Sequence, residues 1–215
     1  MKIKTIFTCI LIFIPLIITL IVLPTLSDTI PVHFGFGGNV TRFGSRYEVL
    51  IIPVITIILG VFLILYGRKT HKNNVLLWVT IGITLIFLSI QIWFLHLAYT
   101  QAETIFNDNF DIIQIISVLI GISCIIIGNV MPKLKQNYIV GIRTSWTLKS
   151  EVTWHKTHRL GGKILVAFGI AYLLLTLFVL EGSMSLFVFL LGFLLIAIIL
   201  IIYSYHIYKQ ESITN

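Results

Sequence analysis

Three side chains in the second half of the chain have types and a spacing that could hold a metal ion or move a proton. Glu151, His155 and His158 follow one another at +4 and +3, so on a helix they would lie within an arc of about 60°. A zinc protease needs paired ligands beside a general base, as in H-E-x-x-H, and the chain lacks that motif. The ordinary alternative is that Glu151 pairs with a neighbouring His or Arg, and the sequence leaves both interpretations open.

Other catalytic patterns are missing from the sequence. There is no G-x-S-x-G nucleophile motif, no phosphate-binding P-loop and no acidic cluster suited to magnesium. His33 has no second metal ligand near it. We therefore expect no catalytic residue, no bound metal and no cofactor, and we do not expect an enzyme. A membrane enzyme acting on lipid or peptide remains an alternative, and it would lose activity when Glu151 or His155 is removed.

The surrounding elements must be membrane helices. The chain has 215 residues, of which 58% are hydrophobic and 11% charged, with a mean hydropathy of +1.04. That composition excludes a soluble globular protein. About 20 apolar residues cross the bilayer as a helix, and lipid cannot satisfy an open backbone. Six stretches approach this length: Ile3–Leu26, Val49–Tyr66, Val75–Leu97, Ile112–Met131, Ile164–Leu180 and Leu186–Tyr205. We predict an all-α integral membrane protein with six transmembrane helices, multi-pass in the cell membrane.

The first stretch could instead be a signal peptide. Its apolar run is too long for the hydrophobic region of a signal peptide, and no A-x-A-like cleavage site follows it. We expect it to remain as the first helix.

The distribution of basic residues predicts the orientation. If the N-terminus is inside, thirteen of the fifteen Lys and Arg residues face the cytoplasm, and only Arg42 and Arg46 lie outside. Because such a bias orients membrane proteins, both termini are predicted to be cytoplasmic. The net charge of +7 is then explained by membrane orientation, and we expect no direct contact with nucleic acid.

The chain divides into three predicted segments. Residues 1–66 would form a two-helix membrane domain with an outer loop at 27–48, and residues 67–111 the third helix with its flanking loops. Residues 112–215 would form a C-terminal membrane domain with a cytoplasmic loop at 132–163.

The outer loop at 27–48 contains Pro31 and four glycines, which favour turns over a long helix. It also carries His33, Arg42, Arg46 and several aromatic residues. These residues favour either a lid whose aromatic rings sit among lipid headgroups or a recognition surface for something arriving from outside. The sequence supports the two equally.

The inner loop is basic and contains two tryptophans, Trp146 and Trp154, of a kind that favours the membrane interface. Thr147 is predicted to cap a helix that begins at about Leu148, and Gly161-Gly162 to end or hinge it before the fifth span. Arg143 would lie on a turn, within reach of a phosphate headgroup or a protein carboxylate. A lipid anchor and a docking platform are equally supported by these residues.

Within the spans, Ser117, Gly121, Cys124 and Gly128 recur on one face and predict close helix packing. Gln91 is expected to pair with another helix. No Asp, Glu, Lys or Arg lies deep in a predicted span, which argues against an ion-coupled transporter. A small transporter or channel remains an alternative, which substrate flux in proteoliposomes would reveal.

The inner loop resembles a known family. The pattern N-x3-G-x-R-T-x-W-T-L-x2-E-x2-W, together with Gly128-Asn129-x-Met131-Pro132 upstream, resembles the SdpI family of bacterial membrane proteins, named for immunity to the Sdp killing toxin. The segment from Ile30-Pro31-Val32-His33 to Gly44-Ser45-Arg46 resembles the uncharacterised domain often fused ahead of it. The two resemblances cover most of the chain.

The resemblance implies a bacterial immunity protein that protects its host from a secreted toxin and signals by sequestering a transcriptional repressor at the membrane. A peptide or protein toxin would meet the two outer loops, residues 27–48 and 98–111, and the repressor would meet the inner loop, residues 132–163. The outer residues implied are Pro31, His33, Arg42 and Arg46. The inner residues implied are Asn137, Gly141, Arg143, Thr144, Trp146, Thr147, Glu151 and Trp154.

Overall fold

The computed structural model describes residues 2–35, 39–69, 73–103, 110–180 and 183–214. Six long helices dominate it, and all six are long and apolar enough to span a membrane. They are α1 (Lys2–Val22), α2 (Ile51–Lys69), α3 (Asn73–Thr100), α4 (Phe110–Val130), α6 (Glu151–Phe178) and α7 (Ser183–Thr214). The predicted all-α membrane fold is confirmed, and the Ile- and Val-rich stretches are helical because lipid leaves the backbone no other hydrogen-bond partner.

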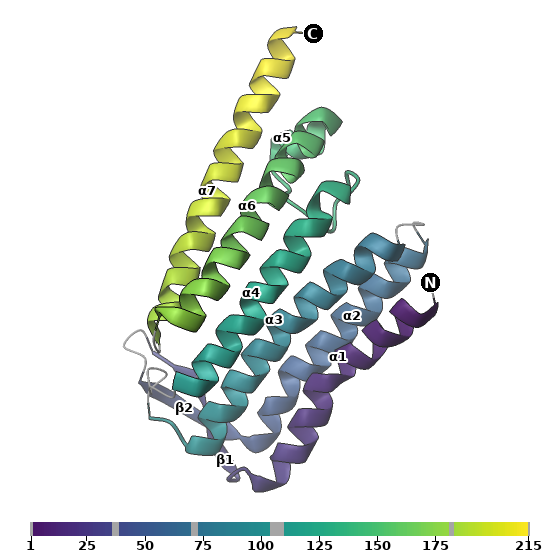
Figure 1. Ribbon diagram of the computed structural model, residues 1–215. Coiled ribbons are helices and arrows are strands. Elements are labelled where there is room, and N and C mark those ends of the chain that lie inside the picture. The colour runs from purple at the N-terminus through teal and green to yellow at the C-terminus, as the bar shows by residue number, and fades with distance from the viewer. Residues whose placement is uncertain (1, 36–38, 70–72, 104–109, 181–182, 215) are drawn as a thin grey trace.

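The helices lie side by side in chain order (Figure 1). Helix α3 packs against α1 and α2 on one side and against α4 on the other, while α6 lies between α4 and α7. The last helix is the least enclosed of the six spans and α3 the most enclosed. Both termini lie at one end of the bundle, together with the short helix α5 (Ser145–Lys149).

Polar side chains form hydrogen bonds between helices, as predicted for Gln91. The buried amide of Gln91 in α3 donates to Thr19 Oγ1 of α1 at 2.7 Å and to the Val49 carbonyl at 3.1 Å. Between α4 and α6, the Gln114 amide donates to the Thr176 carbonyl at 3.5 Å. Such pairs hold helices together in a medium that offers no competing water.

The small face of α4 packs closely against a neighbouring helix, as its spacing predicted, and the structure shows that this helix is α6. A Cβ added at Gly128 would stand 2.9 Å from the Gly162 carbonyl oxygen, and one added at Gly162 would stand 2.6 Å from the Gly128 carbonyl oxygen. Gly121 likewise faces Leu173 and Gly169. The two backbones therefore touch, which only glycine permits at these positions.

The hinge predicted at Gly161-Gly162 is wrong. Helix α6 runs without interruption through both glycines to Phe178, and both are enclosed by neighbouring helices. Gly162 packs against Gly128 of α4, and Gly161 lies against Met131, Ile142 and Leu200 of α7. The two glycines therefore mark contacts with neighbouring elements and not a flexible joint.

The opposite end of the bundle carries a β-hairpin that the sequence analysis did not predict (Figure 1). Strand β1 (Thr29–Phe34) pairs antiparallel with β2 (Val40–Ser45). A 3₁₀ helix, η2 (Arg46–Leu50), leads from β2 into α2, and Ser45 and Glu48 close its first turn as a capping box. Ile30 is buried with Leu26, Val49, Leu95 and Ala98, so the hairpin is fixed to the ends of the helices.

Candidate partner-binding loop

The interval 132–163, predicted as a loop, contains substantial regular structure. After the 3₁₀ helix η3 (Met131–Lys133), an irregular segment with several bends leads to α5, and α6 begins at Glu151. Almost half of α6 therefore lies in the predicted loop. We call residues 134–150 the connecting segment, which lies at the same end of the bundle as both termini (Figure 1).

Asn137 organises a turn within the connecting segment. Its Oδ1 accepts hydrogen bonds from the backbone N–H groups of Ile139 and Val140, at 2.9 and 2.8 Å. Its amide nitrogen donates to the carbonyls of Lys135 and Val140, at 2.8 and 3.0 Å. An Asn side chain can replace backbone partners in this way, so the amide of Asn137 shapes the segment and is not available to a partner.

Trp154 and His158 form the buried base on which the connecting segment rests. The Trp154 indole is fully buried and donates to the Leu134 carbonyl at 2.7 Å, and its ring stacks on His158 with centroids 4.0 Å apart. Gly141 lies directly over this pair with φ +124°. A side chain there would collide with His158 Nε2, so both the backbone angle and the space require glycine.

His158 connects the segment to α6 through both ring nitrogens. The Ile142 N–H lies 3.0 Å from Nε2, which must accept, and Nδ1 lies 2.9 Å from the Trp154 carbonyl, to which it donates. Only the neutral ring with its proton on Nδ1 satisfies both bonds. His158 is therefore a structural residue.

The predicted capping role of Thr147 is wrong, because Thr144 and Ser150 are the N-caps. Thr144 Oγ1 accepts from the Thr147 N–H at 3.2 Å and Ser150 Oγ accepts from the Thr153 N–H at 3.0 Å. Thr147, which is fully buried, accepts at Oγ1 from the Thr144 N–H at 2.9 Å and donates to the Ile142 carbonyl at 2.8 Å. It is the third residue of α5 and completes the capping box that Thr144 begins.

The eight inner residues named above therefore fall into two groups. The first group sets the path of the backbone and consists of Asn137, Gly141, Thr144, Thr147 and Trp154. The second group presents surface. Arg143 and Glu151 are exposed, and Trp146 is half-buried. Arg143 is steadied by a 2.6 Å hydrogen bond from Nη1 to the Tyr138 carbonyl. Tyr138 itself, which the sequence analysis did not single out, is 77% exposed; a tyrosine in a polar loop gives no signal of its exposure.

The structure separates the three residues first considered as a metal site. Glu151 and His155 form an exposed pair with 3.8 Å between Oε1 and Nε2. His158 is buried, and both of its nitrogens are engaged as described above. The ordinary interpretation, pairing of Glu151 with a neighbouring histidine, matches the geometry. Among the residues that the structure describes, no group of three or more His, Cys, Asp or Glu could hold a metal ion.

Helix α7 also contacts the connecting segment and the start of α6, and the sequence did not predict these contacts. The hydroxyls of Ser204 and Thr144 share a hydrogen bond at 3.2 Å, and Tyr205 meets Trp146 edge-on with centroids 5.2 Å apart. The Glu211 carboxylate accepts from Ser150 Oγ and, at 3.1 Å, from Thr153 Oγ1. We call these contacts the α7 clamp. The partners are about 60 residues apart in sequence, so no local pattern indicates them.

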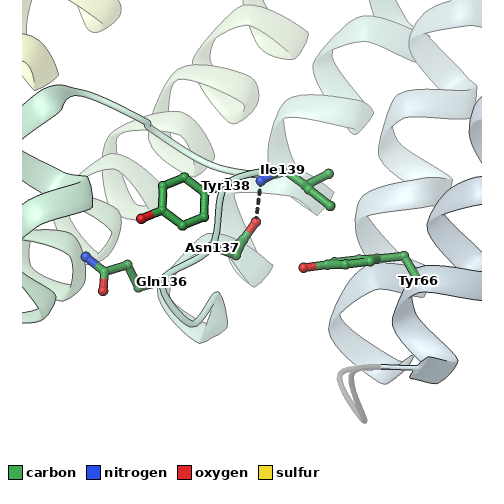
Figure 2. A pocket seen from close by; sticks show the side chains of 5 residues that line it. All are labelled: Tyr66, Gln136, Asn137, Tyr138 and Ile139. Atoms are coloured by element: carbon green, nitrogen blue, oxygen red, sulfur yellow. Dashed lines mark hydrogen bonds between the residues drawn. The ribbon is translucent and has the colours of Figure 1, made fainter.

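An open groove lies between the connecting segment and the first half of the protein. It has a volume of about 420 Å³ and is lined by Tyr66 of α2 and by the turn at Gln136, Asn137, Tyr138 and Ile139. Figure 2 shows the Tyr66 ring extending toward the Asn137 turn, with the hydrogen bond from Ile139 to Asn137 drawn. The groove thus brings together residues from two of the three predicted segments.

The four predicted toxin-facing residues all lie on or beside the hairpin. His33 Nδ1 is 2.6 Å from Thr41 Oγ1, and Arg42 pairs with Glu48 at 3.1 Å. Arg46 lies 3.5 Å from Asp28 Oδ1 and donates to the Leu26 carbonyl. Pro31 is buried, so it supports the strand and presents no surface.

The exposed part of the hairpin combines cations with aromatic rings. Phe43 and Tyr47 are 58% and 59% exposed, and the Arg46 guanidinium lies 5.6 Å from the centroid of the Tyr47 ring. Arg42 is also exposed. Such a surface suits both contact with headgroups and recognition of a partner.

Together, the six spans, the hairpin at one end and the structured connecting segment at the other define a multi-pass membrane protein with a folded polar surface on each side. Two family models match the chain: the SdpI/YfhL protein family over residues 133–204 and a domain of unknown function (DUF1648) over residues 10–57. The chain is 30% identical over 208 residues to the "Immunity protein SdpI" of Bacillus subtilis (strain 168), covering 96% of this chain and 97% of that protein.

This chain belongs to the SdpI family, as its loop motif indicated. An "Uncharacterized protein" of Archaeoglobus fulgidus is 57% identical over 30 residues, which is 14% of this chain and 16% of that protein. No solved structure matches the chain.

Proposed function

We propose that this protein is an immunity protein that protects the cell in whose membrane it lies from a secreted peptide or protein toxin. The observation that carries this proposal is the match to the immunity protein of Bacillus subtilis along almost the whole of both chains. A match of that extent includes the hairpin, the spans and the connecting segment together. Membership of the family offers no support for an enzymatic activity.

The orientation belongs to the same proposal. The termini and the connecting segment are assigned to the cytoplasm because thirteen of the fifteen basic residues would lie there. The hairpin would then face outward, with Arg42, Arg46, Phe43 and Tyr47 as the surface that meets the toxin. His33 would act by holding Thr41 in the neighbouring strand.

Toxin challenge of a sensitive host tests protection directly. Cells expressing the chain should survive the Sdp toxin at concentrations that kill cells carrying an empty vector. A variant with Arg42 and Arg46 changed to Gln should lose protection while remaining in the membrane. Death of cells that contain the parent protein at normal level would contradict immunity to this toxin.

We further propose that the connecting segment recruits a cytoplasmic repressor. Tyr138 and Arg143 are exposed on a segment whose backbone is held by Asn137, Gly141 and Thr147. Glu151 is exposed beside it at the start of α6. A toxin can change repressor affinity only if it favours one of two arrangements of the spans. Since α6 continues without interruption through Gly161-Gly162, we expect the segment to move together with α6 and α7 relative to α4.

A photo-reactive amino acid at position 138 tests recruitment in cells that carry the protein. Crosslinking should capture a DNA-binding protein, with a yield that changes when toxin is added. Arg143→Ala should abolish the crosslink, and Lys149→Ala, which removes another exposed cation from the same segment, should retain it. Equal yields in the two variants would refute the role of Arg143.

A further inference from the structure

A second basic surface lies beside the connecting segment, and neither the toxin nor the repressor proposal uses it. Lys156, Arg159 and Lys163 follow one another at +3 and +4 on α6, so they occupy one face of the helix. With Leu160 and with Tyr203 of α7, they line a hollow of about 290 Å³. We call this hollow the basic hollow.

The three cations of the basic hollow have no acidic partner within the described chain. Each is exposed, and no ion pair of the described residues includes any of them. Glu151 pairs with His155. Glu151 also lies about 140° around the axis of α6 from Lys156. Glu211 accepts from Ser150 and Thr153 at the start of α6. The hollow therefore gathers like charges that repel each other unless an anion binds among them.

The position of the basic hollow along α6 corresponds to the headgroup level of a bilayer. Lys163 is the last charged residue before the apolar run that begins at Ile164 and continues to Leu180. Tyr203 stands near the matching end of the apolar run of α7, and tyrosine favours the interface. Basic groups between helices at this depth are suited to lipid phosphates.

Exposed apolar side chains continue from the basic hollow toward the middle of the membrane. Ile170 and Leu174 lie 7 and 11 residues after Lys163 and share its face of α6; they are 48% and 53% exposed. Ile199, one turn before Tyr203 on α7, is 48% exposed. A molecule whose phosphate sits among the cations can therefore lay a hydrocarbon chain along this stripe.

We propose that the basic hollow binds an anionic phospholipid, with its phosphate among Lys156, Arg159 and Lys163 and one acyl chain along Ile170 and Leu174. The source of the phosphate is a lipid and not a free anion, because the hollow opens onto the apolar stripe. The bound lipid neutralises cations beside the start of α6 and links the helix to the composition of the surrounding membrane. The site does not depend on the immunity function.

Lipid binding to the purified full-length chain in a neutral detergent tests this proposal. Phosphatidylglycerol and phosphatidylcholine with identical acyl chains are titrated, and the bound lipid is counted by native mass spectrometry. Two or three favourable phosphate contacts predict at least about tenfold tighter binding of the anionic lipid. Equal binding of the two lipids by the parent protein would overturn the proposal.

Two variants with the same net charge locate the site. The triple variant K156Q/R159Q/K163Q should lose the preference for phosphatidylglycerol, and K133Q/K135Q/K149Q, which removes three exposed cations at the same end of the bundle, should retain it. Loss of preference in both would mean a general effect of charge. The single change Arg159→Gln should weaken the preference partly, which keeps the test valid if the triple variant does not fold.

A soluble phosphate separates lipid binding from binding of a free anion. Glycerophosphoglycerol is phosphatidylglycerol without its acyl chains and carries the same phosphodiester, so it should leave bound phosphatidylglycerol in place at concentrations where the lipid saturates the site. Displacement at similar concentrations would show that the hollow takes a free anion and would refute the assignment to lipid.

Discussion

At the scale of single residues, most residues of the family motif in the connecting segment determine the path of its backbone. Gly141 allows the backbone to pass over His158 and Trp154, and Asn137 replaces backbone hydrogen-bond partners in its turn. The motif thereby places Arg143 at the surface. Substituting a buried motif residue and substituting Arg143 should therefore have different physical consequences, even where both abolish function.

Thr147 allows the structural role to be measured. Valine has the same shape but cannot take part in the hydrogen bonds with the Thr144 N–H and the Ile142 carbonyl. Leaving these buried groups unpaired should cost about 1–3 kcal/mol, so Thr147→Val should lower the thermal unfolding midpoint in detergent. Thr147→Ser keeps the hydroxyl and should lie much closer to the parent. If the two variants unfold at the same temperature, the hydroxyl does not carry the stability.

At the scale of elements, the start of α6 depends on α7. The Glu211 carboxylate lies at the N-terminal end of α6, where the helix dipole and the Ser150 and Thr153 hydroxyls all favour negative charge. Ser204 and Tyr205 support α5 from the same helix. A helix that is largely exposed along its span is thus fixed at one end by polar contacts.

Removal of the Glu211 carboxylate should loosen the connecting segment without unfolding the bundle. Glu211→Ala should raise amide hydrogen exchange in residues 145–155 by about 5- to 30-fold, corresponding to roughly 1–2 kcal/mol of local stability. Ser212→Ala is the control, because Ser212 bonds only to the Lys209 carbonyl among described residues. Unchanged exchange in the Glu211 variant would show that the α7 clamp does not stabilise this segment.

The contact between α4 and α6 makes a second prediction at this scale. A leucine at Gly162 would have to displace the Gly128 carbonyl and Pro132, which lie within 2.8 Å of an added Cβ. Overpacking of this kind costs about 1–3 kcal/mol or more, so Gly162→Leu should lower the unfolding midpoint in detergent. Ala167→Leu, at an exposed position of the same helix, should not. Equal stability of both variants would contradict the close packing of the two backbones.

At the scale of the whole molecule, the polar surfaces are confined to the two ends of the bundle. In the part of the chain that the structure describes, the spans connect the hairpin to the connecting segment, so a signal between them must change how those helices pack. The uninterrupted course of α6 from the connecting segment to Phe178 provides one such connection.

The orientation of the molecule is tested by labelling cysteines in intact cells. A single cysteine is introduced at an exposed position of a variant that lacks Cys9 and Cys124. Ser145 and Asn39 are exposed and suit this purpose, whereas Thr147 and Ser150 are buried. An impermeant maleimide added outside should label Asn39→Cys and leave Ser145→Cys unlabelled until the cells are opened. The reverse pattern would overturn the assignment of the connecting segment to the cytoplasm.

The sequence by itself determined the class of protein, the six spans, the family and the face of α4 that packs closely against another helix. These follow from composition and from the spacing of residues within single helices, because lipid leaves the backbone one regular structure and small residues mark where helices touch. Local patterns of the same kind also predicted an exposed polar loop, a helix cap at Thr147 and a hinge at Gly161-Gly162. Those predictions of the cap and the hinge are wrong.

Only the tertiary structure decided which residues of the connecting segment are buried and which are presented. Trp154 is enclosed because Leu134 accepts its N–H across 20 residues, and the segment is held in place by Glu211 and Ser204 from the far end of the chain. Burial of this kind depends on partners brought together by folding. A polar residue involved in such a contact has the same sequence signature as one that faces water.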